Sequence, residues 1–556
     1  MTASVRGADA GSRPDPRSGT GTGTGTGSPA DASSGKGEEA KGGDQESAPP
    51  PAPSPLDLAH LGRRRPPLFA HWLAEVGFVT TIVLSMMLSE YFISGFSIVL
   101  PPLADALDIA IAARTWPAGV TNLTTAALLQ PCARLCDLYG SRVVFLAGHA
   151  WLLLWSIVAG FSTSPIMLIL CRAMQGIGPA AFLPAGLALL SQTYRPGPRK
   201  NLVFAIYGAF ACLGFYVGIF VGALAVAFLT WRWYFWIGAA VGFAIALAAL
   251  LTTIPRSERA VDPNVSMDWW GVVTIVPGLI LVVFAFTDGG HAPDGWRTPY
   301  VYLSLLAGLI FLAAAVYVEG WVAKQPLLSP EIFRQRRGLK RLMGALFCSY
   351  GVFGLFLFYA SFYIETVMHA SAMLTAAWFT PMAVGGMILA ITGGFILHLV
   401  PNRILMVISC LGFLLSTLLF ALMPEEGSTS FLYWAYIFPA MLGGTIGVDI
   451  TFNVTNVYIT TAMPRRHQAA AGGLINSLLY LGIAFWLGIA ELAVSAKVEA
   501  DGRELDPRTQ YQIGFWTGVA LSVVSLALTV TVKMGQAEAA LTADEKAELE
   551  RQSEDS

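Results

Sequence analysis

The feature that most constrains this chain is a succession of apolar stretches, each about twenty residues long, separated by short polar hinges. Lipid hydrocarbon cannot hydrogen-bond an exposed loop backbone, so helices cross the bilayer and the polar hinges lie outside it. Of the 556 residues, 55% are hydrophobic and only 13% are charged, well below the charged fraction of about 25% in soluble domains. The pattern predicts an all-helical integral membrane protein.

Fourteen stretches are long enough to cross about 30 Å of hydrocarbon as helices that rise about 1.5 Å per residue. They begin near Phe78, Pro117, Val143, Ile166, Leu202, Trp233, Trp270, Val301, Leu342, Thr375, Ile404, Phe431, Ala469 and Ile513. An even number of spans places both termini on one side of the membrane. With the termini inside, twenty Lys and Arg residues near the spans are cytoplasmic and six are outside, and this bias predicts cytoplasmic termini.

A hinge at residues 133–142 is repeated weakly at 394–403, with Arg403 matching Arg142 and His398 standing where the first copy has an Asp. Such a repeat indicates a body of two halves. Residues 1–67 are rich in Gly, Ser, Thr and Pro and have too few large apolar residues to form a core. The predicted segments are a disordered cytoplasmic tail (1–67), a six-helix half (78–254), an inserted helix pair (268–322), a basic cytoplasmic loop (323–341), a second six-helix half (342–533) and an acidic cytoplasmic tail (534–556).

The first copy of the hinge reads Ala-Arg-Leu-Cys-Asp-Leu-Tyr-Gly-Ser-Arg. Gly140 permits a tight turn between antiparallel helices, and the charge of Asp137 suits a helix N-terminus or a nearby Arg. Leu135, Asp137, Gly140 and Arg142 match the loop G-x-L-a-D-r-x-G-r-k that is typical of the major facilitator superfamily, with Ala133 in place of the first Gly. The resemblance implies a conformational latch that breaks when the halves rock, and the alternative is a plain solvent-exposed hinge.

The chain resembles the fourteen-span drug:proton antiporter branch of that superfamily, close to fungal aminotriazole-resistance and low-affinity ammonium transporters. In the fifth span, Gly214, Gly218 and Gly222 form a stripe of small residues against which another helix can pack closely. The stripe is similar to the antiporter motif g-x-x-x-G-P-x-x-G-G. However, Ile219 stands where the family has Pro, and Ala223 stands where it has the last Gly. Uptake or facilitated diffusion therefore stays open.

In the fourth span, Arg172, Gln175, Gly176 and Gly178 form a motif similar to R-x-x-q-G-x-g of the superfamily. An Arg in hydrocarbon costs about 3 kcal/mol or more without a partner or water. Counting about 1.5 Å per residue puts Glu90 of the first span at nearly the same depth. We expect Glu90 and Arg172 to face each other across the translocation path, with Glu90 carrying the coupling proton. The alternative is a snorkelling Arg172 and a structural Glu90.

The twelfth span contains Gly447 and Asp449 in a segment similar to G-x-D-x-x-F of fungal fourteen-span relatives. Counting from the outer start of that span places Asp449 toward the cytoplasmic side. Asp449 is a second candidate for protonation or for attracting a cation. The alternative is a boundary carboxylate that is hydrogen-bonded to Thr451 or Asn453.

The sequence contains no recognisable catalytic constellation. It has no phosphate-binding Gly-x-x-x-x-Gly-Lys-Ser/Thr loop, so we expect no energy from bound ATP. The histidines lack metal-ligand spacing, and the six cysteines fall in or beside apolar runs as packing residues do. We therefore expect no enzyme activity, no metal and no other cofactor, and the absence of a basic domain argues against nucleic acid binding.

Together these features predict a major facilitator fold of two six-helix halves plus two inserted central helices. The leading hypothesis is a monomeric secondary transporter of the plasma membrane that exports drugs or toxic solutes by proton-coupled alternating access. The alternatives are uptake or facilitated transport of a small nutrient, of ammonium or siderophore type, and a transporter-like sensor without flux. The expected partners are an unidentified small-molecule substrate, protons and the lipid bilayer.

Overall fold

The computed structural model describes residues 65–110, 113–194, 198–252, 266–290, 292–328, 338–396, 400–462, 465–502, 505–532 and 534, and over these residues the chain is all-helical. Nearly all of the predicted disordered and acidic tails, and residues 329–337 of the predicted basic loop, lie outside the described residues. The organisation of the rest follows from the helices.

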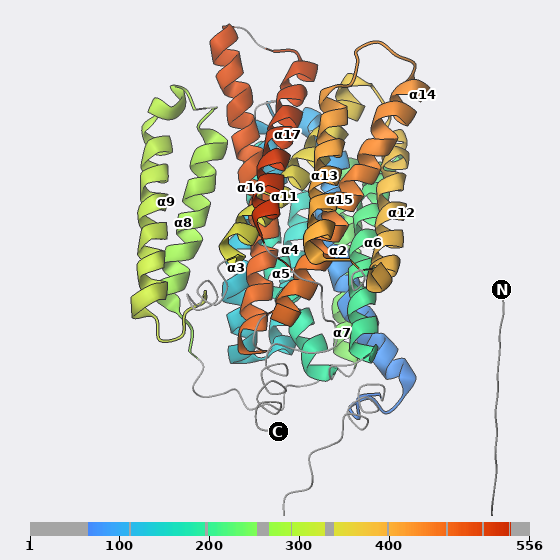
Figure 1. The fold of residues 1–556 in the computed structure, drawn as a ribbon, viewed down its shortest axis with the longest axis vertical. Helices are drawn as coiled ribbons and strands as arrows, with labels where there is room; N and C mark the ends of the chain where they lie inside the picture. Colours follow the sequence, from blue (N-terminus) through green and yellow to red (C-terminus); the bar gives the residue numbers. More distant parts are fainter. Residues whose placement is uncertain are drawn as a thin grey trace, which may run out of the picture. The chain divides into compact units, whose positions relative to one another are not determined.

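Fourteen helices of 19 residues or more form one bundle, together with the four-residue helix α14 (Thr429–Leu432) (Figure 1). The long helices are α2 (Trp72–Ala106), α3 (Thr115–Tyr139), α4 (Ser141–Gly160), α5 (Pro165–Thr193), α6 (Pro198–Phe228), α7 (Trp231–Leu251), α8 (Trp269–Asp288), α9 (Pro299–Tyr317), α11 (Leu339–Phe362), α12 (Ala372–Ile396), α13 (Asn402–Ala421), α15 (Phe438–Ala462), α16 (Arg465–Asp501) and α17 (Pro507–Thr531). Every predicted span coincides with one of these helices. The largest difference in starting position is six residues, at Phe78 against Trp72 and at Ile513 against Pro507. For the twelfth span the match includes α14, which leads through a π-helical turn into α15.

Thirteen helical spans in the described part of the chain are long and apolar enough to cross a membrane, and α3 is the fourteenth long helix. Three of its threonines point at α5. Thr121, Thr124 and Thr125 donate hydrogen bonds to the α5 carbonyls of Arg172, Ala173 and Gly176. Because these hydroxyls are satisfied by α5, they do not need water, and α3 crosses the bundle with the others.

The helices pack as two halves and an inserted pair. In the first half, α2 packs against α6 and α7, α4 against α5 and α7, and α3 against α5. In the second half, α11 packs against α16 and α17, α13 against α15 and α17, and α12 against α15. The halves meet along two seams, α3 with α16 and α6 with α12. The predicted fold class is confirmed.

The inserted pair, α8 and α9, stands beside the bundle (Figure 1). Its helix α8 contacts both α3 and α16. The Trp116 indole of α3 donates to Asp288 of α8 at 3.4 Å, and Thr287 lies so close to Gly488 of α16 that a Cβ there would sit 2.6 Å from its hydroxyl oxygen. Elsewhere the pair exposes large apolar side chains, such as Trp270 and Ile310, as lipid-facing helices do.

Several helices start where the sequence supplies an N-cap followed by proline. Ser164 accepts a hydrogen bond from the Met167 amide before α5, and Asp506 accepts one from the Thr509 amide before α17. A side-chain oxygen at this position satisfies an amide that has no partner inside the helix, and proline fits the first turn because its nitrogen carries no proton. These caps fix where the polar hinges end.

Candidate functional site

The first hinge is a one-residue turn between α3 and α4. Gly140 has a φ of +88°, which residues with a side chain rarely adopt, so the predicted tight turn is present. Asp137 pairs with Arg134, one turn earlier on α3, at 3.9 Å, and its side chain is 60% exposed. An ion pair this open to solvent is weak. Leu135 is half-buried, and Arg142 lies in the first turn of α4. The latch role of these residues remains a prediction.

Arg134 of this hinge makes hydrogen bonds to the segments on both sides of the inserted pair. Its guanidinium donates to the side-chain oxygen of Gln325 at 2.7 Å and to the carbonyl of Ser266 at 3.3 Å. The Ser266 amide also donates to the Gln325 oxygen at 3.1 Å. Because Ser266 precedes α8 and Gln325 follows α9, Arg134 ties the hinge to both ends of the inserted pair.

In the second copy of the hinge, His398 lies outside the described residues. The turn that follows has Pro401 directly before α13, and Arg403 donates to the carbonyl of Val530 on α17 at 2.6 Å. Arg403 therefore joins α13 to α17, both of the second half.

Arg172 is buried inside the first half, with 1% of its surface exposed. Its guanidinium donates to the carbonyls of Pro117 (3.3 Å) and Phe92 (3.2 Å) and to the side-chain oxygen of Gln175 (3.1 Å). It also stacks on the ring of Phe96 at 3.9 Å. Carbonyls and an aromatic face thus supply the partners that a buried cation requires.

The expected pairing of Arg172 with Glu90 is therefore wrong. Arg172 contacts α2 at Phe92 and Phe96, and on a helix with about 100° per residue, residues 90 and 92 point about 200° apart. Counting depth along the helices placed both residues at a similar level. It gave no information on the direction in which each side chain points.

The glycines of the α5 motif lie against neighbouring helices. A Cβ on Gly176 would collide with Thr124 and with the carbonyl of Thr121 on α3, and a Cβ on Gly178 would lie 2.7 Å from Leu152 of α4. Gln175 extends the Arg172 network by donating to Ser156 of α4 at 2.9 Å.

The glycine stripe of α6 faces α2. A Cβ on Gly214 would collide with the backbone of Met87, and one on Gly218 would lie 2.6 Å from the carbonyl oxygen of Tyr91. Gly222 faces Gly95, where the Cβ distance to the carbonyl oxygen is 2.9 Å. Ile219, which occupies the position of the family's Pro, is fully buried. The stripe therefore holds α2 and α6 at backbone contact.

Two acidic side chains from different halves lie near each other inside the bundle. Asp449 of α15 accepts hydrogen bonds from the Thr445 hydroxyl (2.7 Å) and from the Cys212 thiol of α6 (3.2 Å). Glu90, near the middle of the 35-residue α2, lies within range of charge repulsion from Asp449. Tyr207 of α6 and Tyr480 of α16 lie on the Glu90 side of this group. We call these five residues, together with Thr445, the central polar cluster.

The hydrogen-bonding alternative for Asp449 is corrected by this geometry, whereas its position toward the cytoplasmic side remains a prediction. Its side chain is bonded to Thr445 and Cys212, whereas Thr451 bonds to Ser409 and the Asn453 amide bonds to the Asp449 backbone carbonyl.

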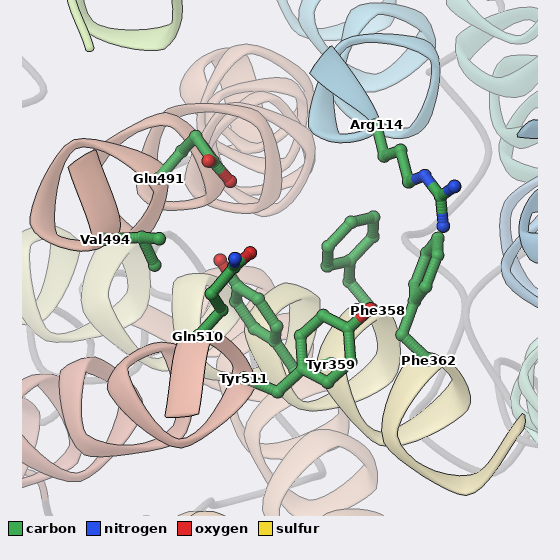
Figure 2. A pocket seen from close by; sticks show the side chains of 8 residues that line it. All are labelled: Arg114, Phe358, Tyr359, Phe362, Glu491, Val494, Gln510 and Tyr511. Carbon is green, nitrogen blue, oxygen red and sulfur yellow. The ribbon is translucent and has the colours of Figure 1, made fainter. Parts of the chain in front are cut away.

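Aromatic side chains line a small pocket at the end of the bundle where α3 begins, which the charge bias predicts to face outside. Figure 2 shows this pocket, where Arg114, directly before α3, approaches Phe362 of α11, with Glu491 of α16 and Tyr511 of α17 on its other walls. The Arg114 guanidinium lies 5.8 Å from the Phe362 ring centre and pairs with Asp105 at 2.7 Å. Residues from both halves thus meet at this end.

At the opposite end, Glu75 of α2 is the centre of a polar group within the first half. Its two carboxylate oxygens accept hydrogen bonds from Nε and Nη2 of Arg199 on α6, at 2.7 and 2.5 Å, and it accepts one from Tyr194 at 3.0 Å. Burial, and next the hydrogen bond to Glu75, raise the pKa of Tyr194, which therefore stays a neutral donor. The group fastens the first turns of α2 and α6 together.

A bundle of fourteen membrane-length helices in two halves, with acidic side chains where the halves meet, defines a transporter of the alternating-access type. A sequence profile of the Major Facilitator Superfamily matches residues 82–487. The chain belongs to the Major Facilitator Superfamily. The resemblance of its motifs to this superfamily is thereby confirmed.

Three similar fungal proteins have different named roles. The efflux pump terJ of Aspergillus terreus is 30% identical over 469 residues, covering 82% of this chain and 87% of that protein. The low affinity ammonium transporter of Saccharomyces cerevisiae is 32% identical over 424 residues, covering 75% and 80%. The aminotriazole resistance protein of the same yeast is 27% identical over 452 residues, covering 80% and 81%.

Solved structures share the fold at low sequence identity. The peptide transporter POT has a TM-score of 0.56 at 15% identity, covering 81% of this chain and 93% of that one. The nucleoside transporter NupG has a TM-score of 0.54 at 14% identity, covering 83% and 100%. These likenesses concern the fold of the bundle.

Proposed function

We propose that this chain is a proton-coupled exporter of small toxic solutes. The observation that carries the proposal is the proximity of Glu90 and Asp449 inside the bundle, each from a different half. Two carboxylates in a low-dielectric site repel each other, and the repulsion is relieved when one binds a proton or when a cation binds between them. A site of this kind lets a proton and a cationic solute compete.

Export is favoured by the names of two relatives, an efflux pump and an aminotriazole resistance protein. The Lys and Arg bias favours cytoplasmic termini, and a small-solute exporter of this kind belongs in the plasma membrane. Glu90 and Asp449 come from one chain, so a monomer suffices for transport. In this proposal Asp137, Gly140 and Arg142 form the cytoplasmic latch of the rocking halves.

Uptake of an ammonium-sized cation is the second candidate. It is favoured by Ile219, which replaces the Pro of the antiporter motif and leaves α6 without an internal proline, and by the 32% identity to a low affinity ammonium transporter. The central polar cluster suits this function also, because its carboxylates attract small cations.

The test uses the purified full chain in liposomes with an imposed pH difference. Ethidium, a permanent cation, is the probe for export, and methylammonium is the probe for uptake, with protein-free liposomes as the control for passive movement of the neutral amine. An antiporter accumulates ethidium when the lumen is acid, since outward proton flow drives solute inward. A symporter accumulates methylammonium when the outside is acid.

Glu90→Gln and Asp449→Asn are expected to abolish the pH-driven accumulation of ethidium while ethidium still equilibrates down its own gradient. Glu499→Gln, at an exposed position on α16, is the matched control and should behave as the parent. Methylammonium accumulation without ethidium accumulation would replace export by uptake. No protein-dependent flux of either probe would favour the transporter-like sensor.

A further inference from the structure

Thr445 of α15 has two hydrogen-bond acceptors and one hydroxyl proton. Its oxygen lies 2.9 Å from the carbonyl oxygen of Met382 on α12 and 2.7 Å from the Asp449 carboxyl. A threonine hydroxyl donates once and accepts up to twice. The two close contacts are therefore both satisfied only if one of the partners is itself a donor, and a carbonyl is never a donor.

The partner that can donate is a protonated Asp449. We propose that Asp449 binds a proton and that the hydrogen bond of Thr445 depends on this proton. When the proton leaves, the Thr445 hydroxyl stops donating to the Met382 carbonyl of α12 and donates to the Asp449 carboxylate instead. The proposal rests on the proton coupling proposed above. With the proton bound, Asp449 donates to Thr445 and Thr445 donates to Met382. Without it, Thr445 rotates and donates to the carboxylate, and the bond between α15 and α12 is lost.

The hydrogen bonds of the two arrangements are comparable in total strength. The protonated arrangement has two neutral hydrogen bonds through Thr445, and the ionised one has a single bond to a charged acceptor, which is about twice as strong as a neutral bond. The Cys212 thiol donates to Asp449 in both arrangements. The geometry therefore permits a switch that does not trap either state.

The surroundings place this switch at a seam between the halves. α12 approaches Asp449 without any intervening side chain, because Gly386 faces the carboxyl and a Cβ there would lie 2.8 Å from its oxygen. Two turns earlier on the same helix, Thr380 bonds to Tyr216 of α6 at 3.1 Å. The prolyl nitrogen of Pro381 inside α12 carries no proton, so this part of the helix lacks one internal hydrogen bond. Loss of the hydrogen bond from Thr445 to Met382 would therefore loosen α12 close to its contact with α6.

The titratable groups that face Asp449 are Cys212 of α6 and Glu90 of α2, with Tyr207 and Tyr480 beyond Glu90. Among the described residues, the contacts that α12, α13 and α11 make with α15 near Asp449 involve uncharged groups. α12 presents Met382 and Gly386, α13 presents Gly412 and Ser409, and α11 presents Phe356. Among these neighbouring groups, Glu90 is therefore the carboxyl group whose charge acts on Asp449.

Infrared difference spectroscopy of the purified chain between acid and alkaline pH tests the proposal without depending on flux. The carboxylic acid C=O band of Asp449 is identified by its loss in Asp449→Asn, with Glu90→Gln as the background that removes the signal of Glu90. We expect this band to be present at acid pH, to shift in frequency in Thr445→Val, and to return to the parent position in Thr445→Ser. Thr392→Val, on α12 where the hydroxyl bonds within its own helix, is the matched control and should leave the band unchanged.

If Thr445→Val does not fold, Thr445→Cys replaces it, because a thiol is a weaker hydrogen-bonding partner and should give a smaller shift. Absence of an Asp449-dependent acid band, or a band that Thr445 substitutions do not move, would overturn the proposal. If the Asp449 band responds to the Thr445 substitutions as expected but the chain shows no pH-driven flux, the transport proposal is refuted. The proton-dependent hydrogen-bond exchange at Thr445 would still be supported.

Discussion

Replacing Gly218 by Ala should be among the most damaging single-methyl additions in the first half. The new Cβ would lie 2.6 Å from the Tyr91 carbonyl oxygen and 2.8 Å from the Tyr91 Cα. Carbon atoms pack at about 3.5 Å or more, so α2 and α6 would have to separate by about 0.7 Å at this point. Both obstructing atoms belong to the backbone, which cannot rotate away as a side chain can.

The separation also disturbs a pair of reciprocal hydrogen bonds. The Tyr91 hydroxyl donates to the Tyr234 carbonyl and the Tyr234 hydroxyl donates to the Tyr91 carbonyl, each at 2.7 Å, with the rings stacked at 4.8 Å. Overpacking costs about 1–3 kcal/mol, and a weakened hydrogen bond adds about 1 kcal/mol. We therefore expect Gly218→Ala to lower the free energy of unfolding by about 3 kcal/mol.

The assay is SDS-driven unfolding in mixed micelles, followed by tryptophan fluorescence. Gly208→Ala is the matched control on the same helix, since no atom lies within 4 Å of its added Cβ. Its free energy of unfolding should stay equal or rise by up to about 1 kcal/mol, because alanine favours helices over glycine. Equal stability of the Gly218→Ala and Gly208→Ala variants would refute the close packing of α2 on α6.

Three further predictions concern the ends of the helices. Asp137→Asn should lower pH-driven flux in liposomes by about tenfold, equivalent to about 1.4 kcal/mol, and His398→Asn should change it much less; equal sensitivity would place the latch elsewhere. Glu75→Gln should reduce the free energy of unfolding by about 1–2 kcal/mol, because charged hydrogen bonds become neutral in a partly exposed group. Glu425→Gln is the control, because the Glu425 side chain is 80% exposed in its ion pair with Arg508. It should change the free energy of unfolding by less than about 0.5 kcal/mol, and a similar loss in both variants would contradict the role given to Glu75. Gly140→Ala should lower the same free energy by about 1–2 kcal/mol through its positive φ alone, since nothing lies within 4 Å of the added Cβ; unchanged stability would show that the turn relaxes.

The positions of the helices could be predicted because hydropathy and length report directly on membrane crossing. Gly140 was predictable for a similar reason, since a short hinge between two long helices requires a sharp turn. The spacing of Gly214, Gly218 and Gly222 also indicated a packing face, although only the structure identifies α2 as the helix that lies against it.

The arrangement of the central polar cluster could not be predicted in the same way. Depth counting is one-dimensional, so it placed Glu90 level with Arg172. It could not tell that Arg172 of α5 contacts α2 on the side away from the Glu90 side chain. Cys212 sits in an apolar run that is typical of packing, and its bond to Asp449 comes from the meeting of α6 and α15. Thr445 has no motif of its own, and its two acceptors become visible only when α12 is in place.

The inserted pair makes the two sides of the transporter unequal toward the lipid. Helix α8 contacts both α3 and α16 and so covers one junction of the halves. The other junction is formed by α12 and α6, and there Val384 and Ile388 of α12 are about half exposed. Lipid can therefore contact the junction of the halves beside α12, whereas at the other junction it meets the inserted pair. Because α8 contacts one helix of each half, any relative movement of the halves requires α8 to move against α3 or α16.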